Sequence, residues 1–253
     1  MGSAQQYIDI FNQCRDMICK HSSALMNSKR DEAFEAFQRV GFPTKKVERY
    51  KYTDIEALFA PNYGLNLNRL DIPVNPYDAF KCDVPNMSTS LYFVVNDAFY
   101  KKALPKAELP EGVFVGSLAD FSDHAAFGKV SAMYCQLADD KDAITSLNTM
   151  LAQDALLIYF PKGVKVDRTL QVINILRSDV DLMVNRRVLI YLEDRADARI
   201  LFCDHAADDR NFLTTQVVEV MVGDGAHLDM TCLEETHYKN VRVSNVYIHQ
   251  QAN

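Results

Sequence analysis

The sequence predicts a mainly β protein with an α-helical N-terminal part and a C-terminal parallel β-helix. Apolar side chains recur at helical spacing near the N-terminus, whereas β-branched patterns that repeat about every 30 residues follow residue 155. With 253 residues, 48% of them hydrophobic, the chain can bury a sizeable core. We expect a helical segment over residues 1–60, a mixed α/β connecting region over 61–150 and an incomplete β-helix core over 151–253.

Three helices are expected in the N-terminal segment. The first starts at a Ser3-x-x-Gln6 pattern, which is typical of a capping box. The second covers residues 28–40 and ends at Gly41, because glycine readily adopts the left-handed conformation that terminates a helix. The third starts at a second capping box over residues 53–56. Together these helices would form a helical front to the β region.

The connecting region predicts short strands and one longer helix. Five prolines between residues 73 and 110 indicate turns or loops. Apolar runs predict strands over residues 91–95 and 113–115, and a third at residues 99–100. Residues 142–154 return to helical spacing, which predicts a helix directly ahead of the β-helix core.

The β-helix core is predicted from an internal repeat. Residues 188–196 match residues 218–226 at an offset of 30, and residues 158–164 match residues 190–196 at an offset of 32. A further copy starts at Val246. Each copy consists of a strand, a tight turn and a second strand. The turns centre on Gly163, Arg195 and Gly225.

Two architectures could accommodate this repeat. Antiparallel hairpins in a sandwich would turn at Asp224-Gly225, whereas the equivalent strands of a solenoid would stack in parallel. Parallel strands in an open sheet need crossovers that are usually helical, and no helix is predicted after residue 155. We therefore favour the parallel β-helix. Its inward face would combine Ala198, Ile200 and Phe202 with Leu228, Met230 and Cys232.

The nearest approach to a metal-binding constellation is Cys203-Asp204-His205, with three further ligand types one repeat later. Cys203 and His205 would share the outward face of a strand, where a thiolate and an imidazole could bind iron or zinc. We favour a half-buried cysteine beside a surface histidine in an acidic loop, because the ligand spacing is not that of a metal motif. The three further residues are Glu234, Glu235 and His237.

Two other groups of residues carry a weaker chemical signal. Asp204, Asp208 and Asp209 could represent the carboxylates of a polysaccharide-cleaving β-helix, although a solvated loop explains them better. Gly223-x-Gly225 follows a strand but lacks the third glycine and the helix of a dinucleotide-binding loop. We therefore predict no catalytic, cofactor-binding or metal-ligating residue in this chain.

The charge balance and the apolar runs limit the possible partners. A net charge of −7 and a pI near 5.4 argue against nucleic-acid binding. The longest apolar runs, such as residues 155–160, are too short to cross a bilayer, and we expect neither a membrane segment nor an export leader. A basic cluster fits a solvated turn or a protein contact better than a nucleic-acid patch. It consists of Lys45, Lys46, Arg49 and Lys51, interleaved with Tyr50 and Tyr52.

The cysteines indicate the compartment. The chain has six cysteines and no C-x-x-C pair, and a chain of this length has little need of disulfides. We therefore expect a reducing cytoplasm and packing roles for the thiols. The six are Cys14, Cys19, Cys82, Cys135, Cys203 and Cys232.

Three segments carry recognisable motifs. Residues 41–54 read Gly-Phe-Pro-Thr-Lys-Lys-Val-Glu-Arg-Tyr-Lys-Tyr-Thr-Asp, and residues 146–166 and 225–228 follow in the β region. The first segment resembles the N-terminal signature of SufD-type members of the SufB/SufD family of iron–sulfur cluster assembly proteins, with Tyr50 where relatives often carry tryptophan. The other two, with the following Glu234, are similar to the core that the SufB and SufD types share.

The resemblance implies a right-handed parallel β-helix and a non-catalytic scaffold in the SUF system. In this family, SufB and SufD pair through their β-helices and each docks on a subunit of the SufC ATPase, while SufD supports iron acquisition. The implied partners are SufB-like and SufC-like proteins, and the full assembly would hold an iron–sulfur cluster only transiently. The family's functional histidine lies in later turns, so no family residue is carried over, and we expect the chain to be the N-terminal portion of such a protein.

Two other functions stay open on the sequence alone. One is a β-helix enzyme that acts on polysaccharides, and the other is a structural oligomerisation module. The last predicted strand starts at Val246 and the sequence stops at Asn253, so its edge would need to be covered. We expect either a longer chain or a second chain at this edge, including a homodimer.

Overall fold

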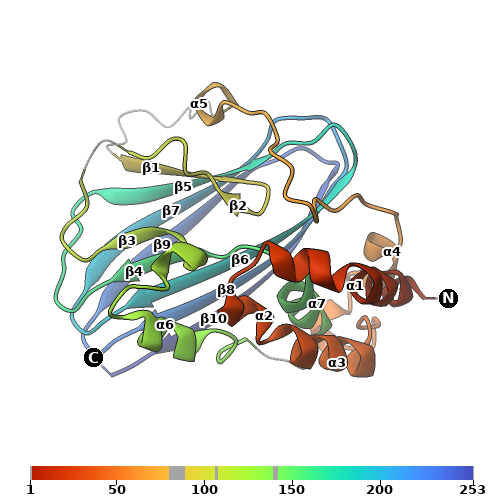
Figure 1. Ribbon diagram of the computed structural model, residues 1–253, viewed down its shortest axis with the longest axis horizontal. Coiled ribbons are helices and arrows are strands. Elements are labelled where there is room, and N and C mark those ends of the chain that lie inside the picture. Colours follow the sequence, from red (N-terminus) through yellow and green to blue (C-terminus); the bar gives the residue numbers. More distant parts are fainter. Residues whose placement is uncertain (1, 80–88, 106–107, 139–141, 253) are drawn as a thin grey trace.

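The computed structural model describes residues 2–79, 89–105, 108–138 and 142–252, and its strands form two facing sheets (Figure 1). In spatial order, sheet A consists of β10 (Asn240–Gln250), β8 (Phe212–Val222), β6 (Leu182–Leu192), β4 (Leu156–Phe160) and β3 (Phe114–Ser117). Sheet B consists of β2 (Ala98–Phe99), β1 (Thr89–Val95), β5 (Thr169–Leu176), β7 (Asp197–Ala206) and β9 (His227–Glu235).

From β4 onward, the chain alternates between the two sheets, and strands one turn apart pair in parallel. The pairs β4–β5, β6–β7 and β8–β9 are therefore three successive turns of a β-helix, and β10 starts the next turn. Among the described strands, antiparallel pairing occurs between β1 and β2 and between β3 and β4. The predicted parallel β-helix is confirmed, and the alternative of an antiparallel sandwich is wrong.

The pairing register reproduces the sequence repeat residue by residue. Ile158 pairs with Ile190, and Val218 lies between Val188 and Val246 of the adjacent strands. The turn between the two strands of each unit has the same left-handed conformation every time, although the middle turn places an arginine where the others have glycine. The φ angles are 72° at Gly163, 60° at Arg195 and 62° at Gly225.

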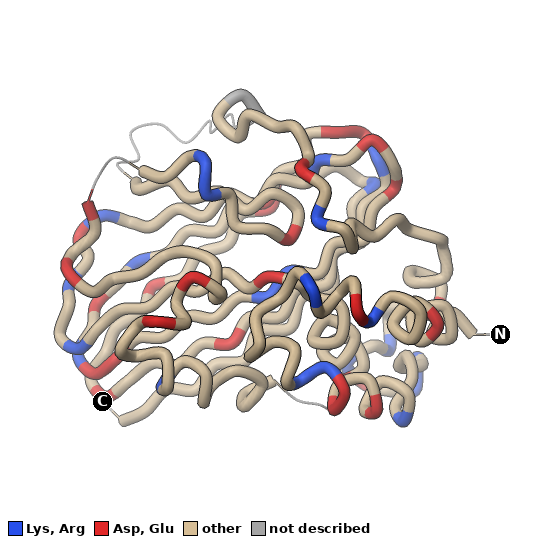
Figure 2. The backbone as a smooth tube through the Cα atoms, viewed as in Figure 1, with Lys and Arg blue, Asp and Glu red and all other residues tan. Residues whose placement is uncertain are grey.

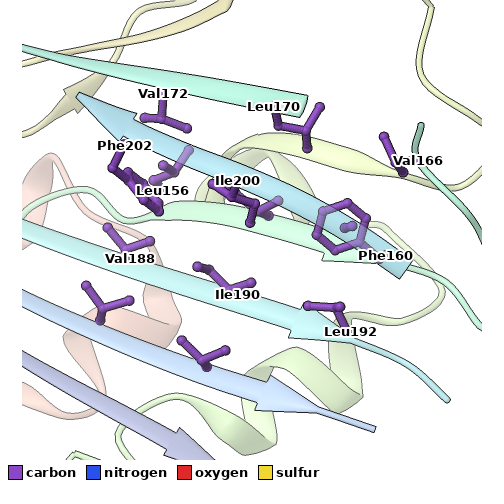
Figure 3. Close-up of a cluster of buried hydrophobic side chains, with 14 of the residues drawn as sticks. Leu156, Phe160, Val166, Leu170, Val172, Val188, Ile190, Leu192, Ile200 and Phe202 are labelled. Atoms are coloured by element: carbon purple, nitrogen blue, oxygen red, sulfur yellow. The ribbon is translucent and has the colours of Figure 1, made fainter. Parts of the chain in front are cut away.

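The space between the sheets is filled by side chains that point inward from successive turns (Figure 3). Val188, Ile190 and Leu192 of β6 pack with Ile200 and Phe202 of β7 in one apolar cluster. The residues that enter this cluster from one strand lie two positions apart, as the pleat of a β-strand requires. The stacking of like residues from turn to turn produces the continuous core that the repeat predicted.

Cys232 has the predicted register but not the predicted burial. It pairs with Phe202, as an inward position requires, yet it is exposed. The reason is that β9 is the edge strand of sheet B, so no strand of the described chain lies on its other side. Leu228 and Met230 of the same strand are partly buried against the core.

Except for the short α5, whose Tyr77 contacts Phe93 of sheet B, the helices form a layer on the outer face of sheet A (Figure 1). They are α1 (Ser3–Lys20), α2 (Ala24–Asn27), α3 (Arg30–Val40), α4 (Ile55–Phe59), α5 (Pro76–Ala79), α6 (Phe127–Met133) and α7 (Ala143–Leu151). Every residue of α7 is buried, because this helix lies between α1 and α3 on one side and the sheet on the other. Met183 and Leu213 of the sheet complete a second core with α1, α3, α4 and α7.

The predicted capping box at the start of α1 is wrong. Gly2 precedes the helix without a side-chain cap, and the amide of Ser3 donates instead to the carboxylate of Glu56. The side chain of Gln6 donates to the carbonyl oxygen of Phe59. The backbone of Ser3 and the side chain of Gln6 are therefore both held by α4, which packs against the start of α1.

The other predicted helices exist with shifted starts. The second predicted helix begins at Arg30, after the separate α2, rather than at residue 28. Arg30 is fully buried, and its guanidinium donates to the carbonyl oxygens of Met150 at 2.8 Å and Ala152 at 2.7 Å. The cap of α4 is Asp54, whose carboxylate accepts the amide of Ala57, rather than the start of the predicted capping box.

The three strands predicted in the connecting region are present as β1, β2 and β3 with slightly different bounds. β1 pairs in parallel with β5 and so extends sheet B by one strand. The helix predicted over residues 142–154 is α7.

Cys82 lies outside the described residues. Charged residues gather in the turns at both ends of the strands (Figure 2), and none of the described helices has the length and apolarity that a membrane crossing requires.

Candidate functional site

The pleat of β7 places Asp204 on the opposite face from Cys203 and His205, which share the outward face as predicted. Cys203 points outward from the β-helix, as predicted, but it is 2% exposed because it packs with Phe93 and Ile173 on the outer face of sheet B. Asp204 points inward. His205 lies beside Glu235, with 3.4 Å between Nδ1 and the carboxylate.

The further candidate ligands lie apart from Cys203. The Nε2 atom of His237 is 2.7 Å from the carbonyl oxygen of Asp208, in the turns at the end of the strands. Glu234 points inward like Asp204, its register partner. No group of three or more histidine, cysteine, aspartate or glutamate side chains in the described ranges is arranged to hold a metal ion. The structure therefore does not bring the sequence-predicted constellation together.

A charged cluster occupies the interior of the β-helix next to the apolar core. The carboxylate of Asp204 contacts Arg186 through one oxygen and Arg242 through the other, the latter at 2.9 Å. Arg242 also contacts Glu234. The Nε atom of Arg186 donates to the carbonyl oxygen of Asn96 at 2.8 Å. Burial lowers the pKa of Arg186, and the adjacent Asp204 opposes that shift.

This interior cluster was missed by the sequence analysis, although the signal was present. Arg186 lies two residues from both Val184 and Val188 on β6. Residues two apart share one face of a strand, so its side chain points inward with theirs. The partner, Asp204, has the same parity as Ile200 and Phe202 on β7. Opposite charges at inward positions of facing strands predict an ion pair, because an unpaired buried charge is costly.

A second buried ion pair lies on the outer face of sheet A. The side chains of Arg187 and Glu219 are fully buried and in contact. Glu219 also accepts the backbone amides of Cys135 at 3.1 Å, Leu137 at 3.1 Å and Ala138 at 3.2 Å. Although burial disfavours a charged guanidinium, the neighbouring Cys135 and Glu219 raise the pKa of Arg187. The pair thus fastens the segment 134–138 to the sheet.

The signature segment 41–54 is anchored through Asp142, the N-cap of α7. Asp142 is 6% exposed, and one of its oxygens accepts Tyr50 Oη at 2.7 Å and Arg49 Nη1 at 2.9 Å. The other oxygen accepts the amides of Ile144 and Thr145, each at 3.0 Å. Burial, and then the hydrogen bond to Asp142, raise the pKa of Tyr50.

The same carboxylate of Asp142 also reaches the β-helix, because it accepts the side-chain amide of Asn245 on β10 at 2.9 Å. The predicted basic cluster is therefore not one uniform patch. Arg49 and Tyr50 belong to the anchor, Lys45 pairs with the exposed Asp54 at 3.1 Å, and the Tyr52 side chain is in solvent.

The remaining candidates have structural roles. Asp208 accepts the amide of Ser178 at 2.8 Å and lies 3.1 Å from Arg177, while Asp209 pairs with Lys239 at 2.7 Å. These carboxylates stabilise the turns at the end of the strands. A Cβ atom at position 223 would lie 2.7 Å from a backbone nitrogen of the turn below, so Gly223 permits the close stacking of turns.

The comparisons with known proteins agree with this architecture. The sequence model of the SufBD protein N-terminal region matches residues 1–172, and that of the SUF system FeS cluster assembly SufBD core domain matches residues 174–253. The chain belongs to the SufBD family. The resemblance of residues 41–54, 146–166 and 225–228 to the SufB/SufD family is therefore confirmed at the level of the family. This SufBD chain corresponds to the N-terminal portion of a family member.

Curated relatives of this SufBD chain come from a plant and a cyanobacterium. The chain is 22% identical over 241 residues to the chloroplastic protein ABCI7 of Arabidopsis thaliana, and 19% identical over 242 residues to an iron–sulfur cluster assembly SufBD family protein of Synechocystis sp.. The matches cover 91% and 92% of this chain but 49% and 51% of the relatives. The chain thus spans about half the length of the curated relatives it matches.

Proposed function

We propose that this SufBD chain is part of a SufD-type scaffold subunit of the SUF assembly and that it performs no catalysis itself. The observation that carries the proposal is the order of the two family matches, over residues 1–172 and 174–253, which together account for nearly the whole chain. The signature at residues 41–54, which resembles SufD-type members, supports SufD over SufB. The subunit would work in a reducing cytoplasm.

The proposed partners are a SufB-like protein and a SufC-like ATPase. In this arrangement the β-helix offers a stiff surface for the partners, and the iron–sulfur cluster is cargo of the assembly rather than a resident cofactor of this chain. The two buried ion pairs, Arg186–Asp204 and Arg187–Glu219, support a rigid platform, since each fixes neighbouring strands or segments to one another. Support of iron acquisition belongs to the same proposal.

Polysaccharide cleavage is disfavoured by the placement of the acidic side chains. Asp204 lies in the interior of the β-helix, paired with Arg186. Asp208 and Asp209 lie in a turn and hold other parts of that turn region. A glycosidase would instead need two carboxylates on opposite sides of one substrate-binding groove.

Anaerobic co-purification tests the scaffold proposal. The natural protein, carrying an affinity tag, would be co-expressed with the SufB-like and SufC-like proteins of the same organism, with each untagged partner alone as the control. We expect both partners to be retained on the resin with the tagged protein. Retention of neither partner would contradict the proposal.

A homodimer through the edge of the β-helix is a second proposal. The observation that favours it is the exposure of Val246 and Ile248 on the edge strand β10, at 47% and 61%. Light scattering over a range of protein concentrations tests it. A dimer mass that disappears when Ile248→Lys is introduced is expected, whereas a monomer at every concentration would contradict it.

A further inference from the structure

A groove of about 420 Å³ lies beside the Asp142 anchor, on the helical side of the molecule. Its polar end is formed by Arg49 together with Asp142. Its apolar wall is formed by Val40, Phe42, Pro43 and Val47. The groove is lined mainly by the signature segment 41–54. The anchor explains this motif only in part, because its hydrogen bonds to Asp142 come from Arg49 and Tyr50.

The apolar wall is both exposed and held in place. Val40 is 42% exposed and Val47 is 45% exposed, although both are large aliphatic residues. Between them, the ring of Phe42 is held by aromatic contacts with Phe37 and Phe59, at centroid distances of 5.3 Å and 4.7 Å. The wall is therefore preformed, so a ligand would pay little ordering entropy to occupy it.

The residues around the groove carry a net positive charge, whereas the whole chain carries a net negative charge. Residues 39–51 contain five lysines and arginines and one glutamate, whereas the whole chain carries −7. The side chain of Arg49 is 57% exposed, and within the described residues its hydrogen bond goes to Asp142 through Nη1 alone. Lys46 is exposed and has no ion-pair partner in the described part of the chain. Donors for a carboxylate are thus available next to the apolar wall.

We propose that this groove binds a peptide segment of a partner protein in which a large apolar side chain stands within a few residues of an acidic one. The apolar side chain packs against Val40 and Val47, and the carboxylate pairs with Arg49. Lys46, the sequence neighbour of Val47, adds positive charge beside this site. A nucleic-acid backbone would need a wider cationic surface than this acidic chain offers. The proposal goes beyond the scaffold function and does not depend on it, because the recognition chemistry follows from the groove alone.

A random dodecapeptide library displayed on phage tests the proposal against the whole chain. We expect the selected sequences to place Asp or Glu within three positions of Leu, Ile, Met or Phe. A fluorescein-labelled peptide of the consensus sequence is then titrated in fluorescence anisotropy. Replacing its acidic residue by the amide should weaken binding by about tenfold or more, and added salt should weaken it further.

Matched variants locate the binding site. Val47→Asp and Lys46→Glu should each weaken peptide binding by about tenfold or more. Their controls, Val180→Asp and Arg168→Glu, alter exposed positions elsewhere and should leave the affinity within about twofold. All four positions are exposed, so we expect unchanged thermal midpoints, which separates lost binding from lost folding.

Three results would overturn the proposal. The first is a selection that yields no consensus, or a consensus without either the acidic or the apolar residue. The second is equal binding of the peptide to the groove variants and to their controls. The third is a concentration-dependent dimer of the unmodified chain that Val47→Asp abolishes, because a second copy would then be the occupant of the groove.

Discussion

At the scale of single residues, the carboxylate of Asp142 connects three parts of the chain. It accepts hydrogen bonds from the signature segment, from the first turn of α7 and from Asn245 on β10. Its side chain is 4% exposed, so water has little access to replace a lost partner. A buried carboxylate with this many donors contributes far more than a surface ion pair.

Asp142→Asn tests this anchor. Loss of the charge weakens the pair with Arg49 and places an amide donor among groups that are themselves donors, so we expect a loss of about 2 kcal/mol in the free energy of unfolding. Urea denaturation measures it. The control is Asp71→Asn, at an exposed pair with Lys102, which should cost less than about 0.5 kcal/mol. Equal effects of the two variants would contradict the role of Asp142.

The buried phenol of Tyr92 predicts a loss of stability in alkali. Burial in the β-helix core raises its pKa from 10.0 to about 12. Its folded pKa lies above its unfolded one, so its contribution is complete below pH 10 and is lost as the pH rises toward 12.

Tyr92→Phe should therefore lose less stability with rising pH than the unmodified chain. Between pH 9 and pH 11 we expect the difference in the free energy of unfolding to be about 1 kcal/mol, measured by urea denaturation at each pH. Tyr52→Phe is the control, because the ring of Tyr52 is 90% exposed. Parallel pH profiles for Tyr92→Phe and the unmodified chain would refute the prediction.

The sequence predicts the direction of side chains on a strand better than their surroundings. The outward direction of Cys203 follows from strand parity. Its burial depends on the segment around Tyr100 and Ala103, about a hundred residues earlier, which packs on the outer face of sheet B. Likewise, the signature motif draws attention to Arg49 and Tyr50, but no local pattern indicates their shared partner in α7.

At the scale of elements, the segment 134–138 depends on one buried ion pair for its position. Three of its backbone amides donate to Glu219, whose charge is balanced by Arg187 alone among the contacts that the described residues make with it. Cys135 also adopts a left-handed φ of 61° within this segment. A conformation of this kind persists only where its surroundings hold it.

Glu219→Gln should release this segment. The variant leaves Arg187 buried without its counter-charge, so we expect a loss of about 3 kcal/mol in the free energy of unfolding. Hydrogen exchange provides a local readout, in which the amides of Cys135, Leu137 and Ala138 lose protection first. Glu111→Gln, at an exposed position, is the control. Unchanged protection of these three amides would show that Glu219 does not hold the segment.

Two glycine substitutions with opposite expected effects on stability test the repeating turn. Gly163 has a φ of 72° and open space around its Cβ position, so Gly163→Ala is strained only by its backbone and should cost about 1 kcal/mol. Gly128 has equally open space but lies in α6, so Gly128→Ala should stabilise by about 0.5 kcal/mol. Thermal unfolding measures both. A shift of the thermal midpoint in the same direction for both variants would contradict the left-handed turn at Gly163.

The β elements follow from the sequence more closely than the helix starts do. In a parallel stack, equivalent residues of successive repeats are paired, so an alignment of the repeats is also an alignment of the strands. The start of α1 is decided instead by Glu56 and Phe59 of α4, a helix that is remote in sequence. A capping motif is a local signal, and here the tertiary contacts of Ser3 and Gln6 override it.

At the scale of the whole molecule, the described chain is a stack of layers. The outer helices cover α7, α7 covers sheet A, and an apolar core fills the space between sheet A and sheet B (Figure 1). Between the two sheets, Arg186, Asp204, Arg242 and Glu234 form ion pairs with one another. This organisation agrees with membership of the SufBD family.

A titration of cluster assembly tests the scaffold proposal most directly. The natural protein is added in increasing amounts to an anaerobic mixture of its SufB-like and SufC-like partners, iron and a sulfur source, and the absorbance of the assembled cluster is followed. A scaffold predicts that the yield rises in proportion to the protein and levels off when it is equimolar with the SufB-like partner. Full yield from trace amounts, or a yield that does not depend on the protein, would contradict the proposal.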